Sequence, residues 1–247
     1  MRILLLSDIH SNLEALKAVL DAAPPHDLVW NLGDVVGYGA NPNEVIDRVR
    51  GLGSIFVRGN HDKACCGIGG IEAFNPIAAR AAQWTHDSLT PENLEWLRQL
   101  PAGPVRPEGS DASCSHGSPL DEDEYLMTAS DVRNIFEYLE AKVSFFGHTH
   151  LQCAYGRANG AFQMFGRLEG PREEVWSRLD PNGVYLINAG SVGQPRDGDP
   201  RAAYALFDSE SLELVQRRVR YDYQTTQLKI VAAGLPDILG ARLAVGR

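Results

Sequence analysis

The sequence predicts an α/β fold in which 247 residues form one domain. In the first third of the chain, short apolar runs of strand length alternate with helical segments, a pattern typical of parallel strands buried under helices. In the later part strand-like segments dominate and indicate a β-meander. The chain is 44% hydrophobic, enough for a substantial core, and no flexible linker divides it. We therefore expect a single domain over residues 1–247.

The N-terminal alternation begins with an apolar strand at residues 3–6. A capping-box pattern follows, with Ser11 three residues before Glu14, and predicts the start of a helix. The further elements of this alternation are expected at residues 28–30 (strand), 42–50 (helix) and 54–57 (strand).

Two helices are predicted in the middle of the chain, at residues 75–88 and after Thr90, which is the expected N-cap with Pro91 at the first helical position. Residues 151–182 look like an irregular insertion that could form a lid or an oligomer contact. The other expected elements are strands at 113–115, 143–146, 184–188 and 202–207, helices at 130–141 and 223–233, and a short last helix.

Charge and cysteine content restrict the class of protein. The net charge of −9 and the pI of about 5.2 disfavour binding to a nucleic-acid backbone or an anionic membrane. The four cysteines form neither a disulfide framework nor a CxxC zinc motif, so we expect reduced thiols. The apolar stretch after Met1-Arg2 is too short for a signal peptide or a membrane span, which favours a cytoplasmic location.

Polar residues that bind metals stand directly after the predicted strands. The loops beyond the carboxyl ends of strands in an α/β sheet converge on one crevice, so residues distant in sequence can meet there. Five of the seven histidines fall in these loops. The residues concerned, in chain order, are Asp8, His10, Asp34, Asn60, His61, His116, His148 and His150.

These side chains offer imidazole nitrogens and carboxylate or amide oxygens without a thiolate. Such a set suits manganese, iron, zinc or similar divalent ions and differs from a closed structural zinc site. Without His61 the set has too many ligands for one ion and suits two ions that share a carboxylate. Asp34 is the natural bridge, because it stands alone on its loop between Gly33 and Gly37.

Five short blocks carry a family resemblance. They resemble, in order, the signature blocks of the calcineurin-like metallophosphoesterase family and indicate its small bacterial, phosphodiesterase-type branch. The blocks are Asp8-Ile9-His10, Gly33-Asp34, Gly59-Asn60-His61-Asp62, His116-Gly117 and Gly147-His148-Thr149-His150.

The resemblance implies a four-layer α/β/β/α sandwich of two mixed sheets flanked by helices, with the later strands forming the second sheet. It implies two divalent metal ions, with manganese as the first choice and iron, zinc, nickel, cobalt or magnesium as alternatives. Asp34 would bridge them. One ion would be bound by Asp8, His10 and His150, and the other by Asn60, His116 and His148.

The activity implied is hydrolysis of small phosphate esters, either diesters or monoesters, by a hydroxide that bridges the two metals. His61 follows a ligand directly, and the matching histidine of the family contacts the phosphate, so His61 is the expected general acid. The expected partner is a small phosphorylated substrate, and a homo-oligomer stays possible.

Two positions depart from the family pattern. Protein serine/threonine phosphatases have a phosphate-binding arginine where this chain has Tyr38, and an acid that supports the catalytic histidine where it has Gly37. Arg196 is a candidate replacement cation for substrate binding, and Arg58 is another. The alternative for Arg196 is a salt bridge to a neighbouring aspartate that merely orders its loop. The two possible partners are Asp197 and Asp199.

Alternative functions remain open at this point. A diadenosine polyphosphate hydrolase is the second candidate. The changes at Gly37 and Tyr38 disfavour a protein phosphatase, and the acidic net charge disfavours a nuclease. A metal-bound scaffold without catalysis is disfavoured by the complete ligand set and by His61.

Overall fold

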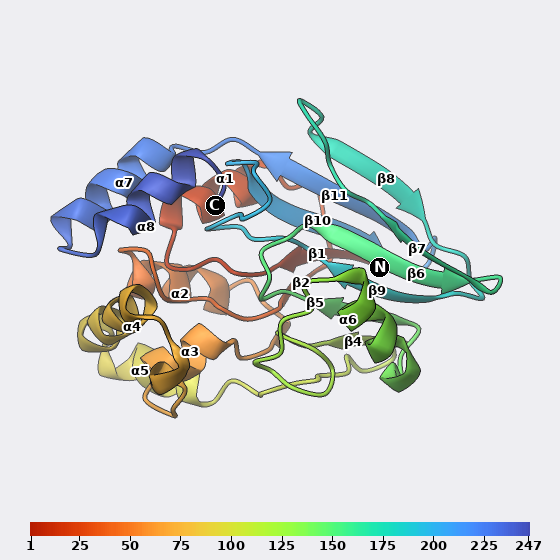
Figure 1. The fold of residues 1–247 in the computed structure, drawn as a ribbon, viewed down its shortest axis with the longest axis horizontal. Coiled ribbons are helices and arrows are strands. Elements are labelled where there is room, and N and C mark those ends of the chain that lie inside the picture. The colour runs from red at the N-terminus through yellow and green to blue at the C-terminus, as the bar shows by residue number, and fades with distance from the viewer.

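Two mixed β-sheets lie face to face in the computed structural model, which describes all 247 residues (Figure 1). The six strands of the first sheet are β1 (Arg2–Leu6), β2 (Leu28–Asn31), β3 (Ile55–Phe56), β8 (Glu174–Arg178), β10 (Ala202–Asp208) and β11 (Glu213–Val219). The five strands of the second are β4 (Ala112–Cys114), β5 (Val143–Phe146), β6 (Cys153–Ala158), β7 (Ala161–Phe165) and β9 (Val184–Asn188). Their spatial orders are β3-β2-β1-β10-β11-β8 and β4-β5-β9-β6-β7.

Helices cover the outer faces of both sheets (Figure 1). Most gather on the side of the first sheet, whereas α6 covers the second. The helices are α1 (Leu13–Ala22), α2 (Pro42–Arg50), α3 (Asn60–Cys65), α4 (Pro76–Ser88), α5 (Pro91–Arg98), α6 (Ala129–Ile135), α7 (Tyr223–Ala232) and α8 (Asp237–Ala241). Short 3₁₀ turns lie at Ile71–Ala73, Phe136–Tyr138 and Arg242–Ala244.

Three apolar layers hold the sandwich together. Side chains alternate between the two faces of a strand, so Ile3 and Leu5 of β1 point to the second sheet while Leu4 and Leu6 point to the helices. A third layer packs Phe136 and its neighbours against the outer face of the second sheet. A strand with apolar contacts on both faces must be apolar throughout, as β1 is. The predicted four-layer α/β/β/α sandwich is confirmed.

Strand direction agrees with the sequence only in part. The pairs β1–β2 and β2–β3 are parallel, as predicted. The pairs β4–β5 and β5–β9 are also parallel, so the β-meander prediction is wrong for these strands. The strands β10, β11 and β8 belong to the first sheet, so the later strands do not all form the second sheet as predicted. The pairing of Ile3 with Phe207 joins distant parts of the chain, and no local pattern encodes it.

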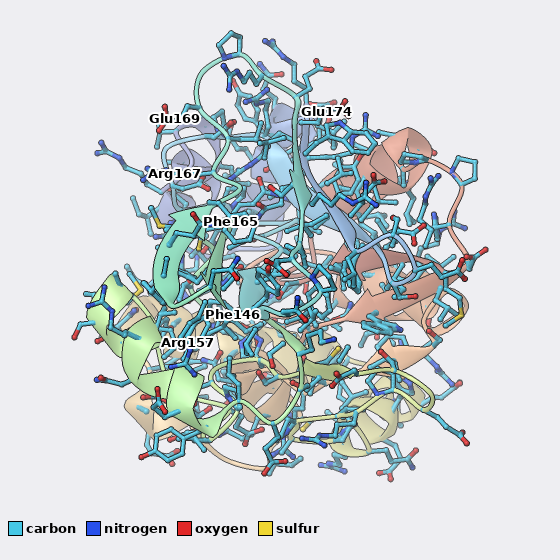
Figure 2. The ribbon with its side chains drawn as sticks, turned by 90° about the vertical axis from the view of Figure 1, so that its right-hand side faces the viewer. Phe146, Arg157, Phe165, Arg167, Glu169 and Glu174 are labelled. Carbon is cyan, nitrogen blue, oxygen red and sulfur yellow. The ribbon has the colours of Figure 1, made fainter.

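Residues 151–182 are not an irregular insertion. They contain β6, β7 and β8, and the first two form an antiparallel hairpin. Its turn is Asn159-Gly160, with φ of 51° and 76°, a dipeptide strongly favoured in two-residue hairpin turns. Figure 2 shows the chain leaving the second sheet at Phe165 and reaching the first sheet at Glu174.

The helix boundaries show which local signals are reliable. Helix α2 has the predicted bounds, and Thr90 caps α5 by accepting a bond from the Asn93 amide (3.2 Å). The capping box of Ser11 and Glu14 is wrong, because Asn12 is the N-cap of α1 and accepts from the Ala15 amide (3.1 Å). The helix predicted at 130–141 ends as α6 at Ile135 and continues only as a 3₁₀ turn.

The structure also shows the state of the cysteines and the lengths of the helices. All four cysteines are free and buried, in agreement with the expectation of reduced thiols. Burial raises the pKa of the Cys153 thiol to about 11, which makes it a poor nucleophile. None of the helices has the length and hydrophobicity needed to cross a lipid bilayer.

The layer between the sheets predicts a large effect for Phe145→Ala. This ring is fully buried and packs edge-on against Trp30 (5.9 Å between ring centroids) and Phe207 (5.3 Å). Its truncation should lower the free energy of unfolding by about 3–5 kcal/mol, measured by urea denaturation. Leu228→Ala is the matched control, because Leu228 is 71% exposed and should change that free energy by less than about 0.5 kcal/mol. Equal effects of the two changes would contradict this account of the core.

Candidate metal centre

The loops at the carboxyl ends of five strands bring all seven expected ligands together. Asp8 and His10 follow β1, Asp34 follows β2, and Asn60 opens α3 just after β3. His116 follows β4, while His148 and His150 follow β5. Each of the seven side chains is less than 9% exposed. The convergence expected from the order of strands and loops is therefore present.

The first group joins Asp8, His10, Asp34 and His150, whose candidate ligand atoms lie within 4.8 Å of one another. Nε2 of His10 and Nε2 of His150 are 3.0 Å apart. Nε2 of His150 lies 3.3 Å from Oδ1 of Asp8, and Nε2 of His10 lies 3.6 Å from Oδ2 of Asp34. Two carboxylates and two imidazoles thus face one small volume.

The second group joins Asp34, His116 and His148. Nε2 of His116 lies 3.3 Å from Oδ2 of Asp34 and 3.1 Å from Nδ1 of His148. Oδ1 of Asn60 is 3.2 Å from the same Nε2 of His116 and so belongs to this group. The two groups share Asp34, as the sequence predicted.

Asp34 meets both groups through a single oxygen. Its Oδ2 faces His10 and His116, whereas its Oδ1 accepts a hydrogen bond from the His61 amide (2.8 Å). A Cβ on Gly59 would lie 2.0 Å from Oδ1, so only glycine allows the carboxylate to sit there. The sequence analysis chose Asp34 as the bridge because a carboxylate can offer one oxygen to each metal. In the structure only Oδ2 faces the two ligand groups, and Oδ1 holds the carboxylate in its orientation.

Backbone carbonyls orient the four histidines. Nδ1 of His10 pairs with the Val36 carbonyl (3.1 Å), Nδ1 of His116 with that of Leu32 (2.8 Å), and Nε2 of His148 with that of Asp123 (3.2 Å). His150 uses Nδ1 in the same way toward Gln194. A carbonyl only accepts, so the ring nitrogen facing it carries the proton and the other nitrogen can offer a lone pair to the centre.

The donor set fits divalent cations. Two unprotonated imidazole nitrogens 3.0 Å apart, as His10 and His150 present, cannot hydrogen bond to each other, whereas a cation between them would satisfy both. The ligands are nitrogen and oxygen only, which suits borderline and hard ions such as zinc, iron and manganese.

Burial shifts the titration of this cluster strongly. Desolvation raises the pKa of Asp8 to about 7, against the opposing effect of His116. Burial is the largest single influence on His116 and lowers its pKa, but the charge and hydrogen bond of Asp34, the charge of Asp8 and the hydrogen bond to the Leu32 carbonyl together raise that pKa to about 10. The buried carboxylates therefore require positive charge beside them.

The backbone at the ligands is strained. Left-handed φ values are unusual outside glycine and cost of order 1–3 kcal/mol each. Nine non-glycine residues of this chain have positive φ, and five of them are expected ligands. The five are Asp8 (52°), His10 (49°), Asp34 (53°), His148 (66°) and His150 (60°). Strain concentrated at one buried cluster is typical of a functional site.

Asp62 positions two loops of the site. The sequence analysis included it only as the last residue of a family block. Its side chain is fully buried and accepts bonds from the Gly59 amide (3.0 Å) and the Val36 amide (3.1 Å). Val36 is the residue whose carbonyl orients His10, so Asp62 connects the loops after β2 and β3. The sequence signal for this role was its position three residues after Gly59, the N-cap of α3.

His61 lies beside the two groups but outside both. Its ring packs against Tyr38 (4.2 Å between centroids), Phe74 (4.5 Å) and His10 (4.9 Å). Its Nδ1 is buried without a hydrogen-bond partner, and a Cβ on Gly37 would lie 2.6 Å from that atom. No acidic side chain can therefore support His61 from position 37. Burial lowers the pKa of His61 to about 4, which keeps the ring neutral.

Arg196 reaches the same region from the loop after β9. Its Nη2 lies 3.4 Å from the Tyr38 hydroxyl and donates to Oε1 of Gln194 (2.9 Å), and its Nε is buried without a partner. The alternative salt bridges of Arg196 are not formed. Asp197 pairs with Arg218, and Asp199 pairs with Arg201 at 2.6 Å.

Arg58, the other candidate cation, is already paired with an acidic side chain. Arg58 forms a forked salt bridge with Glu122 (2.8 Å). Lys63 also pairs with Glu122 (3.1 Å) and with Asp123. Arg196 is therefore the freer arginine of the two that the sequence singled out.

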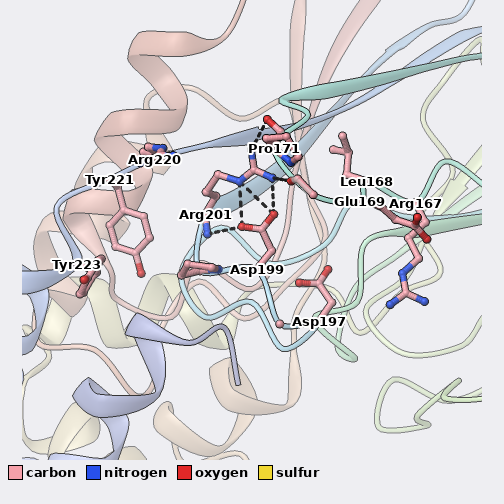
Figure 3. Close-up of a pocket in the computed structure, with 13 residues that line it drawn as sticks. Arg167, Leu168, Glu169, Pro171, Asp197, Asp199, Arg201, Arg220, Tyr221 and Tyr223 are labelled. Carbon is pink, nitrogen blue, oxygen red and sulfur yellow. Dashed lines mark hydrogen bonds and ion pairs between the residues drawn. The ribbon is translucent and has the colours of Figure 1, made fainter.

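Two pockets lie near the ligand groups and the loop that carries Arg196. The first, of about 190 Å³, is lined by Asn60, His61 and His148, with Tyr38, Phe74 and Tyr125 as aromatic walls. The second, of about 730 Å³, shares no residue with the ligand set and is bordered by the loop at 197–201 (Figure 3). There Arg201 bonds to Asp199 and to backbone carbonyls of residues 170–172, which fastens the loop between β7 and β8.

A four-layer sandwich with an imidazole–carboxylate centre at its strand ends defines a metal-dependent phosphoester hydrolase. The sequence pattern of the calcineurin-like phosphoesterase family matches residues 1–152, and the chain belongs to this family. This confirms the resemblance seen in the five sequence blocks.

Two similar proteins match the whole chain, and a third matches part of it. A metallophosphoesterase from Sphaerobacter thermophilus has 41% identity and a TM-score of 0.85, with 100% of this chain and 99% of that chain covered. An uncharacterised protein of Methanocaldococcus jannaschii is 38% identical over 250 residues, covering 99% of this chain and 98% of its own. A symmetrical bis(5′-nucleosyl)-tetraphosphatase of Yersinia enterocolitica is 33% identical over 111 residues, which span 39% of this chain and 35% of that enzyme.

The shared position of Asp34 predicts unequal losses of metal. If each group binds one ion, Asp34→Ala should lower the metal content from about two equivalents per chain to near zero, because both groups lose a ligand. His150→Ala should cost only the equivalent of the first group. Elemental analysis of the purified proteins measures both.

Asp21→Ala is the control for a lost carboxylate, since Asp21 is exposed on α1 far from the centre. Near-UV circular dichroism checks the fold of each variant. An Asp34→Ala protein that still holds one full equivalent would show that the groups do not share this residue.

Proposed function

We propose that the protein is a dinuclear-metal-dependent phosphoesterase that hydrolyses small phosphate esters, either diesters or monoesters. The observation that carries this proposal is the pair of ligand groups around Asp34, with four histidines each fixed by a backbone carbonyl. Manganese is the first choice of metal, and iron, zinc, nickel, cobalt and magnesium also suit these donors. Membership of the calcineurin-like phosphoesterase family supports the reaction type.

Asp8, His10, His150 and Asp34 would hold one ion, and Asn60, His116, His148 and Asp34 the other. A pair of bound divalent ions supplies an activated water at neutral pH and neutralises charge on the phosphoryl oxygens. The protein keeps this centre buried, which strengthens every electrostatic interaction within it.

His61 would act on the leaving group. Its backbone amide holds Asp34, and its ring lines the 190 Å³ hollow through which a substrate can reach the centre. We assign it as the residue that contacts the phosphoryl group and protonates the departing oxygen. The unpartnered Nδ1 is free to form a hydrogen bond with the substrate. Since burial keeps the ring neutral, this role requires the anionic substrate to raise the pKa of His61 when it binds.

Arg196 would bind the substrate as a cation, in place of the arginine that the family's protein phosphatases carry at the position of Tyr38. Its support is the hydrogen bond toward the Tyr38 hydroxyl and the absence of a carboxylate partner. The tyrosine thus orients an arginine that comes from another loop.

A diadenosine polyphosphate hydrolase is the second candidate. The partial similarity to a symmetrical bis(5′-nucleosyl)-tetraphosphatase favours it, as do the aromatic walls of the hollow, on which a base can stack. A panel of phosphate monoesters, diesters and dinucleoside polyphosphates, assayed with each metal restored, decides between the candidates. Absence of turnover on the whole panel would contradict the proposed function.

We also propose three features that the sequence predicted: a single domain over residues 1–247, a cytoplasmic location and a possible homo-oligomer. Contact of both sheets through one apolar layer supports the first.

Replacement of His61 by alanine should separate catalysis from metal binding. His61→Ala should lower turnover by about 10²-fold or more, because a proton donor near the leaving group is lost, while metal content stays unchanged. His26→Ala is the control, since His26 precedes β2 at the opposite end of that strand. If metal content fell together with activity, His61 would be a ligand and the assignment would be wrong.

Replacement of Arg196 by alanine should weaken substrate binding. Loss of a charge-assisted hydrogen bond of about 1.5 kcal/mol or more raises KM by about 10-fold, with a smaller change in kcat. Initial rates over a range of substrate concentrations measure both constants. A variant with unchanged KM would remove Arg196 from the substrate site.

A further inference from the structure

The first sheet ends in β8, an edge strand with one neighbour. It pairs with β11 alone and lies at the upper right of Figure 1. Leu179, directly after β8, donates its amide hydrogen to the Leu212 carbonyl just before β11 (2.9 Å). Main-chain groups of an antiparallel strand point alternately to its two sides, so those of Glu174, Trp176 and Arg178 point away from β11. No strand of the sheet lies there to bond them.

Trp176 exposes a large apolar surface at this open edge. Its side chain is 61% exposed and lies on the same face as its register partner Val215. On that face α1 covers β10 and β11, whereas beside β8 there is a pocket of about 350 Å³ whose lining includes Trp176, Pro24 and Leu206. An open edge strand is a template for pairing with another chain, and aromatic side chains are enriched in protein interfaces. The edge therefore has the features of a contact surface.

The charges at this edge fit a second copy of the same strand. Alternate residues along the chain are positive, negative, apolar, positive and negative, in the order Arg172, Glu174, Trp176, Arg178 and Asp180. If two copies run antiparallel with Trp176 at the centre, each Glu174 lies opposite an Arg178, and each Arg172 opposite an Asp180. Opposite charges that face each other on one side of a strand pair are favourable. The pattern is therefore complementary to its own reverse.

Other registers of the same pairing are unfavourable. A shift by two residues in one direction places Arg178 opposite Arg172 of the second copy, and a shift in the other direction places Glu174 opposite Asp180. Like charges directly opposite each other destabilise a strand pair. A shift by one residue sets the outward main-chain groups of one copy against residues of the other whose groups already face β11. The register centred on Trp176 avoids both problems.

The ion pairs within one chain are compatible with this contact. Between β8 and β11, Arg217 pairs with Glu174 (2.7 Å), while Arg178 is exposed opposite Glu213. Across two copies the row would read Arg217 and Glu174, followed by Arg178 and Glu213 of the second copy. The charges of this row alternate in sign from strand to strand, so the contact would add an opposite charge next to both Glu174 and Arg178.

We propose that β8 is the dimer interface of this protein and pairs antiparallel with β8 of a second copy, about a two-fold axis at Trp176. The first sheets of the two copies then form one continuous sheet, and each pair of facing residues exchanges two main-chain hydrogen bonds. This inference rests on the homo-oligomer proposed above and not on the proposed catalysis. None of the expected metal ligands lies on β8, so contact and catalysis can be tested separately.

Sedimentation velocity over a range of concentrations measures the dimer directly. The full-length protein should be a dimer, and Arg178→Glu should raise its dissociation constant by about 10-fold or more, because like charges then face each other. Trp176→Ala should also weaken the dimer, because the central apolar contact is lost. Arg48→Glu is the matched control and should leave the dissociation constant unchanged, since Arg48 is exposed on α2, which joins β2 and β3 at the other end of the sheet.

A mixing experiment tests the register. Glu174→Arg alone and Arg178→Glu alone each place like charges face to face in their own dimers. In a dimer of one variant with the other, each facing pair again has opposite charges. Native mass spectrometry of an equimolar mixture, with a mass tag on one variant, should therefore show mainly the mixed dimer.

The possible outcomes separate this interface from the other proposals. A wild-type protein that is monomeric at every concentration would overturn both the homo-oligomer and the interface. A dimer that is unaffected by Arg178→Glu and Trp176→Ala would keep the homo-oligomer and refute β8 as its contact. Variants that dissociate without forming a mixed dimer would refute the register centred on Trp176. Near-UV circular dichroism checks that each variant is folded, and no outcome depends on turnover of an ester.

Discussion

The burial of two carboxylates among inward-facing imidazoles is the constraint on which the rest of the structure depends. Asp8 and Asp34 are almost fully removed from water, where an uncompensated charge is very costly. Cations bound by the surrounding nitrogen and oxygen donors would reduce this cost. The left-handed backbone at the ligands and the glycine at position 59 follow from the same need to fit so many polar atoms into a small buried volume.

The two sheets meet this constraint because their parallel strands end at the same place. Hydrogen bonds continue between the loops beyond the strand ends: the Asp8 amide donates to the Gly33 carbonyl (3.0 Å), and the Gly147 amide donates to the His116 carbonyl (2.9 Å). Asn188, at the end of β9, donates to the Gly147 carbonyl (2.8 Å) and so supports the loop that bears His148 and His150. The ligands are therefore held by a network of main-chain bonds that starts in the sheets, and a site built on rigid elements keeps its geometry.

The residues proposed for catalysis and the arginine proposed for substrate binding come from different parts of the chain. The expected ligands and His61 lie within the segment that matches the family, whereas Arg196 lies beyond it. At position 38 a tyrosine takes the place of an arginine, and its hydroxyl lies near an arginine from the loop after β9. The structure thus places an arginine from a remote loop beside Tyr38, and the local sequence around Tyr38 did not reveal this contact.

The sequence by itself determined the local features: the bounds of α2, the Thr90 cap, the strands β5 and β9, and the identity of the polar residues after each strand. These depend on contacts within a few residues, which spacing and residue type encode. Only the tertiary structure decided the pairing of β10 with β1, the assignment of Asp34 Oδ2 to both ligand groups, the role of Asp62, and the partners of Arg196. These depend on residues far apart along the chain, whose distances are set by sheet order and packing and leave no local pattern. Even the N-cap of α1 differs from the prediction. It is Asn12 and not Ser11, because the Ser11 amide donates to the Val35 carbonyl (3.0 Å) in the neighbouring loop.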